Sequence, residues 1–306
     1  MNDWHVEVMS VPATRWPLPR GQLWVEMNTW MRDSERTYVD LIFRASKKYA
    51  SWDPEIPVKV GDYGRITQGR RQLLFFWRTQ RNGMFLKEGN IFENGKAEEY
   101  KIPEPVEHGH EASEGETWVV SQNAEQVDVS VAVGGVTPAL AQCNIRSAFK
   151  FSSGRGAILV MENDTIATVD PPGALRRLLE DPGMNGLVVV SEVHSCSSYA
   201  RLLTAQGGNT VALGLSVEPP ISGVASASAN GKWVRNVSTG NFRTQVNKEG
   251  HRKFYPLFRL VSLTEKATST GLRGSEEADD PPPLPDAEPP WLAEQEKNGQ
   301  KAHSSN

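Results

Sequence analysis

The sequence predicts an α+β fold, with a twisted and mainly antiparallel sheet and peripheral helices. Apolar and polar residues alternate over Val127–Val133 and Ala141–Phe151, and again over Val211–Val217. This period of two is typical of strands with one apolar and one polar face. Turn sequences rich in Gly, Asn and Pro separate the apolar segments. Helical spacing is clearest at Ser34–Ala50, where apolar residues recur every three or four positions.

Several further elements follow along the chain. Ser34 can cap the first helix, and Pro54 and Pro57 end it. We expect strands within Val58–Phe92, a surface loop at 93–115, strands at Ala157–Met161 and Leu187–Val193, helices at Pro171–Leu179 and Ser198–Ala205, a return strand at Val224–Val237 and a last apolar segment at Phe254–Leu263.

Length and composition restrict the class of protein. The chain has 306 residues, of which 38% are hydrophobic and 26 are glycine, so a sizeable core is possible and wholesale disorder is excluded. Only two cysteines occur, which excludes a disulfide scaffold and predicts a reducing, cytoplasmic compartment. Residues 1–20 do not have the pattern of a secretory signal, and we expect no membrane-spanning helix.

Charge is distributed unevenly. The net charge is −4, but residues 267–306 hold three basic and eight acidic side chains, a balance of −5, which leaves +1 on the rest. The near-neutral body argues against nucleic acid as a partner. The charge and composition predict three parts: an N-terminal arm (1–33), a folded domain (34–263) and an acidic, proline-rich, disordered tail (264–306), with Trp291 and Leu292 as its only apolar anchors.

No motif for catalysis or metal binding is evident. The sequence lacks phosphate-binding, dinucleotide-binding, zinc-protease and nucleophile-elbow patterns. His108 and His110 lie in a loop with no second ligand pair at a suitable spacing. His194 and Cys196 lack a third orienting group. We therefore expect no enzyme activity, no cofactor and no metal, and a hydrolase using His194 is a distant alternative.

The alternating segments have two interpretations. They can be half-buried antiparallel sheet with one wet face. Alternatively, they can line a membrane barrel, since Ala141–Phe151 matches the roughly 9–11 residues with which a tilted strand crosses a bilayer. Arg44, Lys47 and Lys48 likewise either complement the dipole of the first helix or form a basic patch for anionic lipid headgroups.

In the order of its segments, the sequence resembles the gasdermin-like pore-forming proteins of fungi, which are related to the N-terminal domain of animal gasdermins. The resemblance covers residues 35–263 and depends on the order of segments. These are Pro57–Thr67 (PVKVGDYGRIT), Phe75–Arg78 (FFWR), Ala157–Met161 (AILVM), a helix with Leu175 and Leu178-Leu179, Val189–Ala200 (VVSEVHSCSSYA) and the return strand that ends in Lys232-Trp233.

The resemblance implies a fold like the gasdermin N-terminal domain and a protein that binds acidic phospholipids, oligomerises and inserts two β-hairpins, roughly residues 117–152 and 208–236. The implied outcome is regulated cell death. The lipid-binding residues would be Arg44, Lys47 and Lys48. The lipid-facing residues would be Val127, Val129, Val131, Val133, Ile145, Phe149, Phe151, Val211, Leu213, Leu215 and Val217, and Asp128, Gln142, Asn144, Arg146 and Lys150 would face the lumen.

The tail would restrain the pore-forming domain until an activating protease removes it. Candidate cleavage positions are Lys266, Leu272 and Arg273, in the linker Thr264–Asp280. The protein would then be cytoplasmic when inactive and on the plasma membrane or another cellular membrane when active. Two alternatives remain: an inert, solubilising tail, and a soluble β-rich interaction module whose P-x-x-P spacings dock an SH3- or WW-type partner.

Overall fold

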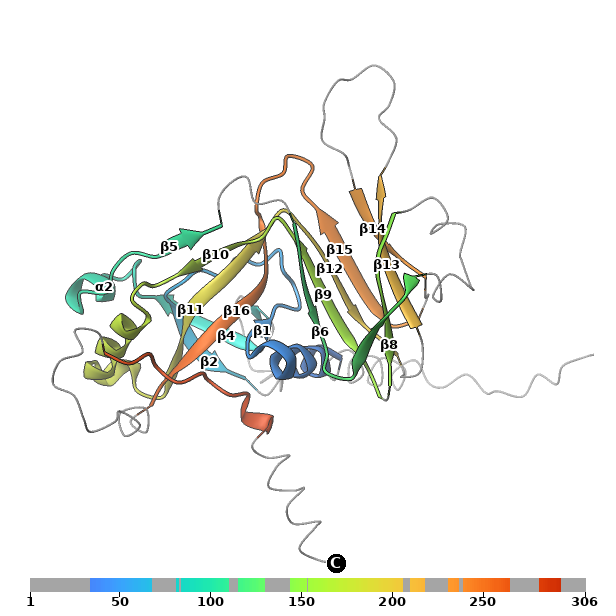
Figure 1. Ribbon diagram of the computed structural model, residues 1–306. Helices are drawn as coiled ribbons and strands as arrows, with labels where there is room; N and C mark the ends of the chain where they lie inside the picture. The colour runs from blue at the N-terminus through green and yellow to red at the C-terminus, as the bar shows by residue number, and fades with distance from the viewer. Residues whose placement is uncertain are drawn as a thin grey trace, which may run out of the picture.

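The computed structural model describes residues 34–67, 81–82, 84–109, 115–129, 144–152, 154–205, 210–217, 231–236, 239–264 and 281–292. This part of the chain is α+β, with few helices and with antiparallel strand pairs (Figure 1). The predicted fold class is therefore confirmed at this level. The predicted arm at 1–33, and residues 68–80 of the predicted strand region Val58–Phe92, lie outside the described residues.

The helical elements of the described part include a helix over residues 34–46, α2 (Lys96–Glu99), the 3-10 helices η2 (Pro172–Glu180) and η3 (Pro182–Met184), and a short helical segment at residues 290–292. The strands are β1 (Tyr49–Ala50), β2 (Asp62–Ile66), β3 (Arg81–Asn82), β4 (Phe85–Asn90), β5 (Val106–His108), β6 (Glu116–Val120), β7 (Ala124–Val127), β8 (Asn144–Phe151), β9 (Ala157–Glu162), β10 (Thr165–Thr168), β11 (Leu187–Cys196), β12 (Ser198–Leu203), β13 (Thr210–Val217), β14 (Gly231–Arg235), β15 (Asn241–Val246) and β16 (Phe254–Leu263).

The largest sheet, sheet A, is built around the two longest strands. Its strand order is β1-β16-β11-β2-β4-β3, and β10 and β5 extend it beside β11. β16 pairs with β11 from Leu263 opposite Leu187 to Phe254 opposite Cys196. The apolar segment predicted at Phe254–Leu263 has the same bounds as β16, and seven of its ten residues are buried.

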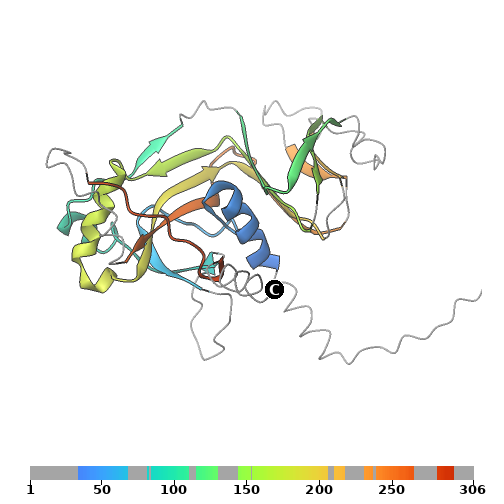
Figure 2. The same cartoon turned by 60° about the horizontal axis from the view of Figure 1, so that its bottom comes forward.

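Two smaller sheets lie face to face beside sheet A. Sheet B has the order β15-β12-β9-β6, and sheet C has the order β14-β13-β8-β7. Figures 1 and 2 show both at the opposite end of the molecule from η2 and η3. We call sheets B and C together the sandwich. Its strands include most of the alternating segments of the sequence.

The helix over residues 34–46 fills the junction between sheets A and B (Figure 2). Val39 and Phe43 belong to the core of sheet A, whereas Tyr38 and Ile42 pack against sheet B. Each pair is separated by four positions, so each lies on one face of the helix. Two adjacent apolar faces explain why this helix is buried between two sheets.

The first predicted helix is wrong at its C-terminal end. It does not extend to Ala50, because Lys47 adopts a left-handed backbone conformation (φ 60°) and donates its backbone N–H to the carbonyl of Phe43, 2.7 Å away. Such a residue ends a helix. Tyr49 and Ala50 instead form β1, opposite Phe258 and Leu257.

The helix predicted at Ser198–Ala205 is also wrong. Residues Ser198–Leu203 form β12, the second strand of sheet B, and all six side chains are buried. β12 pairs with β9 on one edge and with β15 on the other. Two complete ladders satisfy its backbone groups, which outweighs the local helical spacing. The loop predicted at 93–115 likewise contains α2 and β5.

The prediction of a disordered tail is wrong for residues 281–292, which we call the C-terminal strap. Leu284, Ala287 and Trp291 belong to the core of sheet A, and each is at most 4% exposed. The folded body therefore does not end at residue 263. The remaining tail residues, 265–280 and 293–306, lie outside the described part.

Candidate functional site

The interior of the sandwich contains most of the described residues that were predicted to face lipid. Phe149 and Phe151 of β8 are at most 6% exposed. They pack together with Val211 and Leu213 of β13 against Ile158 of β9 and Leu202 of β12. Leu215 packs with Trp233 of β14 and with Val160 and Ala200 of sheet B. In this form of the protein, the apolar face of sheet C is thus covered by sheet B.

Trp118 of β6 is half-buried and packs against this interior from the edge strand of sheet B. Its ring centroid is 5.7 Å from that of Phe149 and 5.9 Å from that of Trp233. Its indole N–H donates to Oε2 of Glu116 at 3.1 Å. A single side chain from sheet B therefore contacts the aromatic residues of two strands of sheet C.

Three residues predicted to face lipid together with Phe149 lie instead on the other face of sheet C: Val127, Val129 and Ile145. The pairing of β8 with β13 shifts between Ser147 and Ile145, which are opposite Leu213 and Gly214. This bulge at Arg146 inverts the alternation, because one extra residue moves every preceding side chain to the opposite face. The prediction that Ile145 shares a face with Phe149 is therefore wrong.

The outer face of sheet C has a smaller apolar patch. Val127, Val129 and Ile145 are half-buried there and pack around Ala148 and Ala212. Arg146, predicted to face a lumen, instead approaches sheet B, where its Nε lies 3.4 Å from Oε1 of Glu116. Asp128 and Lys150 are exposed. Val131, Val133 and Gln142, and the side chains of Asn144 and Val217, lie outside the described residues.

The backbone of the C-terminal strap pairs with β16. The N–H of Ala287 donates to the carbonyl of Leu260, and the N–H of Ser262 donates to the carbonyl of Pro285, both at 2.9 Å. Val261 and Asp286 form the bridge between these two bonds. Because β11 occupies the other edge of β16, the strap covers the edge that the short strand β1 leaves open.

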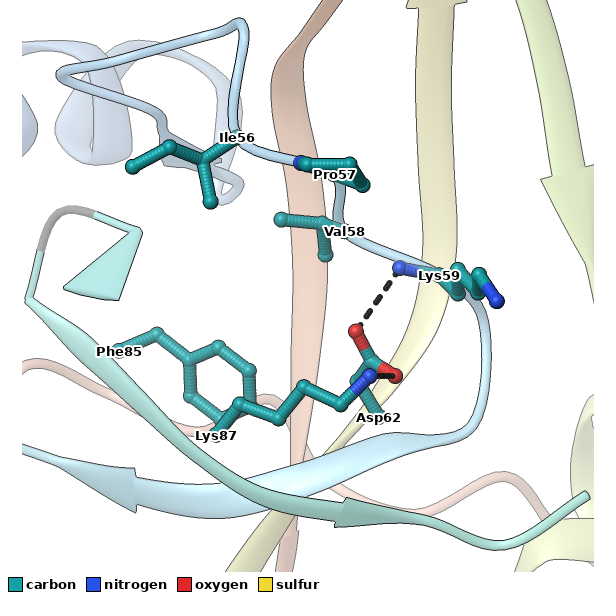
Figure 3. A pocket seen from close by; sticks show the side chains of 7 residues that line it. All are labelled: Ile56, Pro57, Val58, Lys59, Asp62, Phe85 and Lys87. Carbon is teal, nitrogen blue, oxygen red and sulfur yellow. Dashed lines mark hydrogen bonds and ion pairs between the residues drawn. The ribbon is translucent and has the colours of Figure 1, made fainter. Parts of the chain in front are cut away.

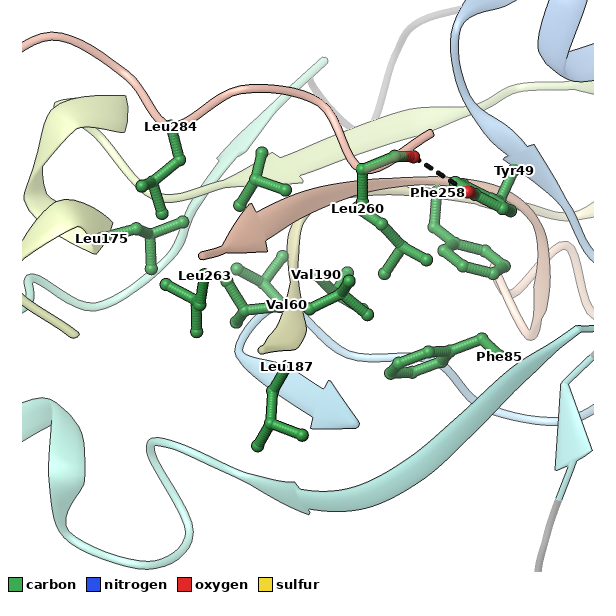
Figure 4. Packing of buried hydrophobic residues seen from close by; sticks show 14 of the residues in the cluster. Tyr49, Val60, Phe85, Leu175, Leu187, Val190, Phe258, Leu260, Leu263 and Leu284 are labelled. Atoms are coloured by element: carbon green, nitrogen blue, oxygen red, sulfur yellow. Dashed lines mark hydrogen bonds between the residues drawn. The ribbon is translucent and has the colours of Figure 1, made fainter. Parts of the chain in front are cut away.

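Three apolar side chains of the strap fill gaps in the core. Figure 4 shows Leu284 pointing toward Leu175 of η2 and Leu263 of β16. Ala287 follows, and the hydroxyl of Tyr49 donates to its carbonyl at 2.8 Å. Burial beneath the strap raises the pKa of Tyr49 above its ordinary value. The strap therefore completes the core.

The strap also makes polar and close backbone contacts. The guanidinium of Arg259 donates to Oδ1 of Asp286 at 2.6 Å. The guanidinium of Arg36 lies 5.2 Å from the ring centroid of Trp291, a cation–π distance. A Cβ at Gly173 would lie 1.7 Å from the carbonyl oxygen of Pro281, so only glycine permits this approach.

The three predicted lipid-binding residues differ in their surroundings. Arg44 is 47% exposed, and its Nε lies 3.2 Å from Oδ1 of Asp40. It lines a hollow of about 450 Å³ together with Arg155 and the amide side chains of Gln122 and Asn123. Lys47 is exposed. We call Arg44, Lys47 and Arg155 the basic edge.

Lys48 is not a surface cation available for lipid headgroups, which corrects the prediction for that residue. Its amine pairs with the carboxylate of Glu192 and lies 2.8 Å from Nε2 of His194. The other ring nitrogen of His194, Nδ1, lies 2.9 Å from Oδ2 of Asp164. The cluster of Lys48, Glu192, His194 and Asp164 therefore joins the helix end to β10 and β11.

The charges of this cluster stabilise one another. Burial lowers the pKa of His194, but its hydrogen bonds to Asp164 and Glu192 outweigh burial and raise that pKa overall. Burial acts against ionisation of Glu192 too, yet the bonds from His194 and Lys48 lower its pKa to about 2. Burial raises the pKa of the Cys196 thiol, which does not favour a nucleophile. The sequence could not identify this cluster, because its members come from three segments.

Other hollows carry charges of both signs. Figure 3 shows one of about 240 Å³, in which Asp62 accepts a bond from the backbone N–H of Lys59 at 2.9 Å and pairs with the amine of Lys87 at 2.6 Å. A cleft of about 740 Å³ is lined by Lys59 and Arg252 but also by Glu93 and Glu107. We find no set of convergent groups there that indicates catalysis.

Metal and membrane-helix signals are also absent from the described part. Among its His, Cys, Asp and Glu residues, no group of three or more is arranged to hold a metal ion. The described helices include none that is both long and apolar enough to span a bilayer.

A scan against protein-family models finds no match for this chain, and a search of curated proteins finds no significant relative. The candidate cleavage residues Lys266, Leu272 and Arg273 lie outside the described residues.

Proposed function

We propose that this protein forms membrane pores. In the proposal it binds acidic phospholipids, oligomerises and inserts amphipathic β-hairpins that permeabilise the membrane, with regulated cell death as the outcome. It acts without enzyme chemistry and is cytoplasmic until it reaches its target membrane. The fold is then of the gasdermin N-terminal type, as the sequence resemblance implies.

The observation that carries this proposal is the two-faced character of sheet C. Phe149, Phe151, Val211 and Leu213 form one continuous apolar face, and sheet B covers it. A membrane strand needs one face for lipid and one for water. The opposite face of these strands carries Glu125, Lys150 and Thr210 beside its smaller apolar patch. Separation of sheets B and C would expose a lipid-compatible face without requiring new residues.

The basic edge supplies the first contact with the membrane. Arg44 and Lys47 are exposed, and Arg44 lines the hollow together with Arg155. Each basic residue near an anionic surface contributes about 1 kcal/mol of attraction. Lys48 has no part in this revised contact, since its amine is held by Glu192.

The C-terminal strap is the proposed restraint. Its side chains complete the core of sheet A, so the body without them has three vacated positions in that core. Cleavage in the linker 265–280 breaks the covalent connection between strap and body and lowers the local concentration of the strap. It also separates acidic residues of the tail from a body with a charge of about +1.

Dye leakage from vesicles tests the proposal. A protease recognition sequence is inserted between Leu272 and Arg273, and the chain is added to vesicles before and after cleavage. We expect leakage after cleavage from vesicles that contain anionic lipid, and little from neutral vesicles. Leakage that is equal before and after cleavage contradicts the restraint, and no leakage in either case contradicts pore formation.

The alternative, a soluble interaction module with a proline-rich docking tail, has less support. The P-x-x-P spacings fall within residues 281–290, and this segment is bound along β16 of its own chain. A partner of the SH3 or WW type would first have to displace Leu284 and Ala287 from the core.

A further inference from the structure

Within the described part of the chain, a short peptide, residues 281–292, makes the contacts that hold the strap. We call the surface that receives it the groove; it is made by β16, β1, η2 and the helix over residues 34–46. The strap therefore binds in the groove as a peptide ligand would, by adding one short strand to an open sheet edge.

The groove discriminates at defined positions of that peptide. It buries a leucine at position 284, a small residue at 287 and a tryptophan at 291. Arg259 selects an acidic residue at 286, and the close approach of the Pro281 carbonyl requires glycine at position 173 of the groove. Apolar anchors give affinity, and the charge pair adds selectivity.

We propose that this groove also accepts the strap of a second copy of the chain, so that straps can exchange between molecules. The linker over residues 265–280 can span at most roughly 55 Å when extended, which is enough to reach a neighbouring molecule. Its own strap usually occupies the groove, since a short linker gives an effective concentration of order millimolar. Exchange occurs where the strap within the chain is weakened or cut.

This inference concerns the restraint in the proposed function, but the binding itself does not depend on pore formation. A chain whose strap has been lost can take the strap of an intact neighbour and be restrained again. Closed exchange between two copies makes a symmetric pair in which each groove is filled by the other chain.

A labelled peptide of residues 281–292 tests the groove directly. It is titrated by fluorescence anisotropy into the full chain with Trp291→Ala, whose own strap competes less. We expect binding at least about tenfold tighter than to the unaltered full chain, and at least about tenfold tighter than for a peptide that carries the same Trp291→Ala change. Equal or absent binding in all three cases overturns the proposal.

Charge reversal tests exchange between copies. The full-length variants Arg259→Glu and Asp286→Arg each place like charges together within one chain, but they complement each other when mixed. We expect heterodimers in the mixture by light scattering, monomers of each variant alone, and monomers of the double variant R259E/D286R. If the mixture stays monomeric while the double variant is folded, exchange between copies is wrong, whatever the result of the leakage assay.

Discussion

Sheet A and the sandwich are both antiparallel, but they are covered in different ways. Sheet A is covered by segments from across the chain: the helix over residues 34–46, η2 and the C-terminal strap. The sandwich is held by the packing of two four-stranded sheets, B and C, against each other. The first arrangement requires segments distant in sequence, whereas the second requires only that two apolar faces stay together.

This difference suggests a division of roles. Removal of the strap acts on sheet A, because Trp291, Leu284 and Ala287 lie in its core and not in the sandwich. The sandwich then contains the apolar face that would meet lipid. The helix over residues 34–46 contacts both regions, with Phe43 on one side and Ile42 on the other. It is the element through which loss of the strap can affect the sandwich.

The largest expected loss of folding stability is that caused by Trp291→Ala in the full chain. Loss of a buried tryptophan side chain costs about 3–5 kcal/mol of unfolding free energy. We expect a lower denaturation midpoint and faster amide exchange in β16 and β1 than in β8 and β13. The matched control is Pro283→Ala, because Pro283 is an exposed strap residue and its change should stay within about 0.5 kcal/mol. Equal effects of the two substitutions would show that the strap is not an anchor.

A substitution on the inner face of sheet C separates stability from leakage. Gln126 is exposed at the edge of that face, opposite Phe149 in the pairing of β7 with β8, so Gln126→Asp should change folding stability by no more than about 0.5 kcal/mol. In a membrane strand, a lipid-facing carboxylate costs about 1–2 kcal/mol in each subunit, so leakage by the cleaved chain should fall at least about tenfold. Val127→Asp, at the neighbouring half-buried position on the outer face, is the control and should leave leakage within about twofold. If both variants leak equally, the assignment of the inner face to lipid is wrong.

The charge cluster at His194 should make stability depend on pH. Because its pKa is raised in the folded state, His194 contributes stability that is fully present below its ordinary value of 6.5 and is lost as pH rises through the folded value. Glu192 and Asp164 have lowered pKa values, so their contribution is present near neutral pH and is lost in acid.

Denaturation midpoints measured between pH 6 and 9 check the histidine contribution. We expect the midpoint of the unaltered chain to fall as pH rises over this range, and His194→Gln to flatten that fall. His251→Gln is the matched control, because His251 is 66% exposed. An unchanged slope in His194→Gln would show that the cluster does not couple to folding.

The smallest expected change in folding stability is that caused by Arg44→Glu. Arg44 is 47% exposed and pairs with Asp40, so the substitution should change stability by no more than about 1 kcal/mol. Binding to anionic vesicles should weaken about five- to thirtyfold, because about 1 kcal/mol of attraction is lost and like-charge repulsion is added. Lys248→Glu on an exposed loop is the control and should weaken binding less. Equal weakening would mean that only net charge matters.

The sequence predicted the strands whose patterns are local. β16, β9 and β11 lie where apolar runs between turn residues indicate them. Alternation also correctly placed Phe149 and Phe151 on one apolar face. These predictions succeed because periodicity in a strand reports directly which face is buried.

The errors arise where distant partners decide. β12 has helical spacing, but two flanking strands make it a strand. The bulge at Arg146 moves Ile145 to the other face, and no residue type in the sequence marks it. Prolines and acidic residues predicted disorder for the strap, yet Leu284, Ala287 and Trp291 fill gaps formed by other segments. Similarly, the pairing of Lys48 with Glu192 depends on contact between segments 144 positions apart.

The most direct test of the central claim is a reversible lock on the strap. Val261 and Asp286 are bridge partners between the two flanking backbone hydrogen bonds, so cysteines at both positions have the spacing for a disulfide. The variant V261C/D286C, with Cys143→Ser and a protease site in 265–280, is oxidised, cleaved and added to anionic vesicles. We predict no leakage until a reductant is added and prompt leakage afterwards. Leakage from the oxidised, cleaved protein, or none after reduction, would contradict a strap that restrains a pore-forming body.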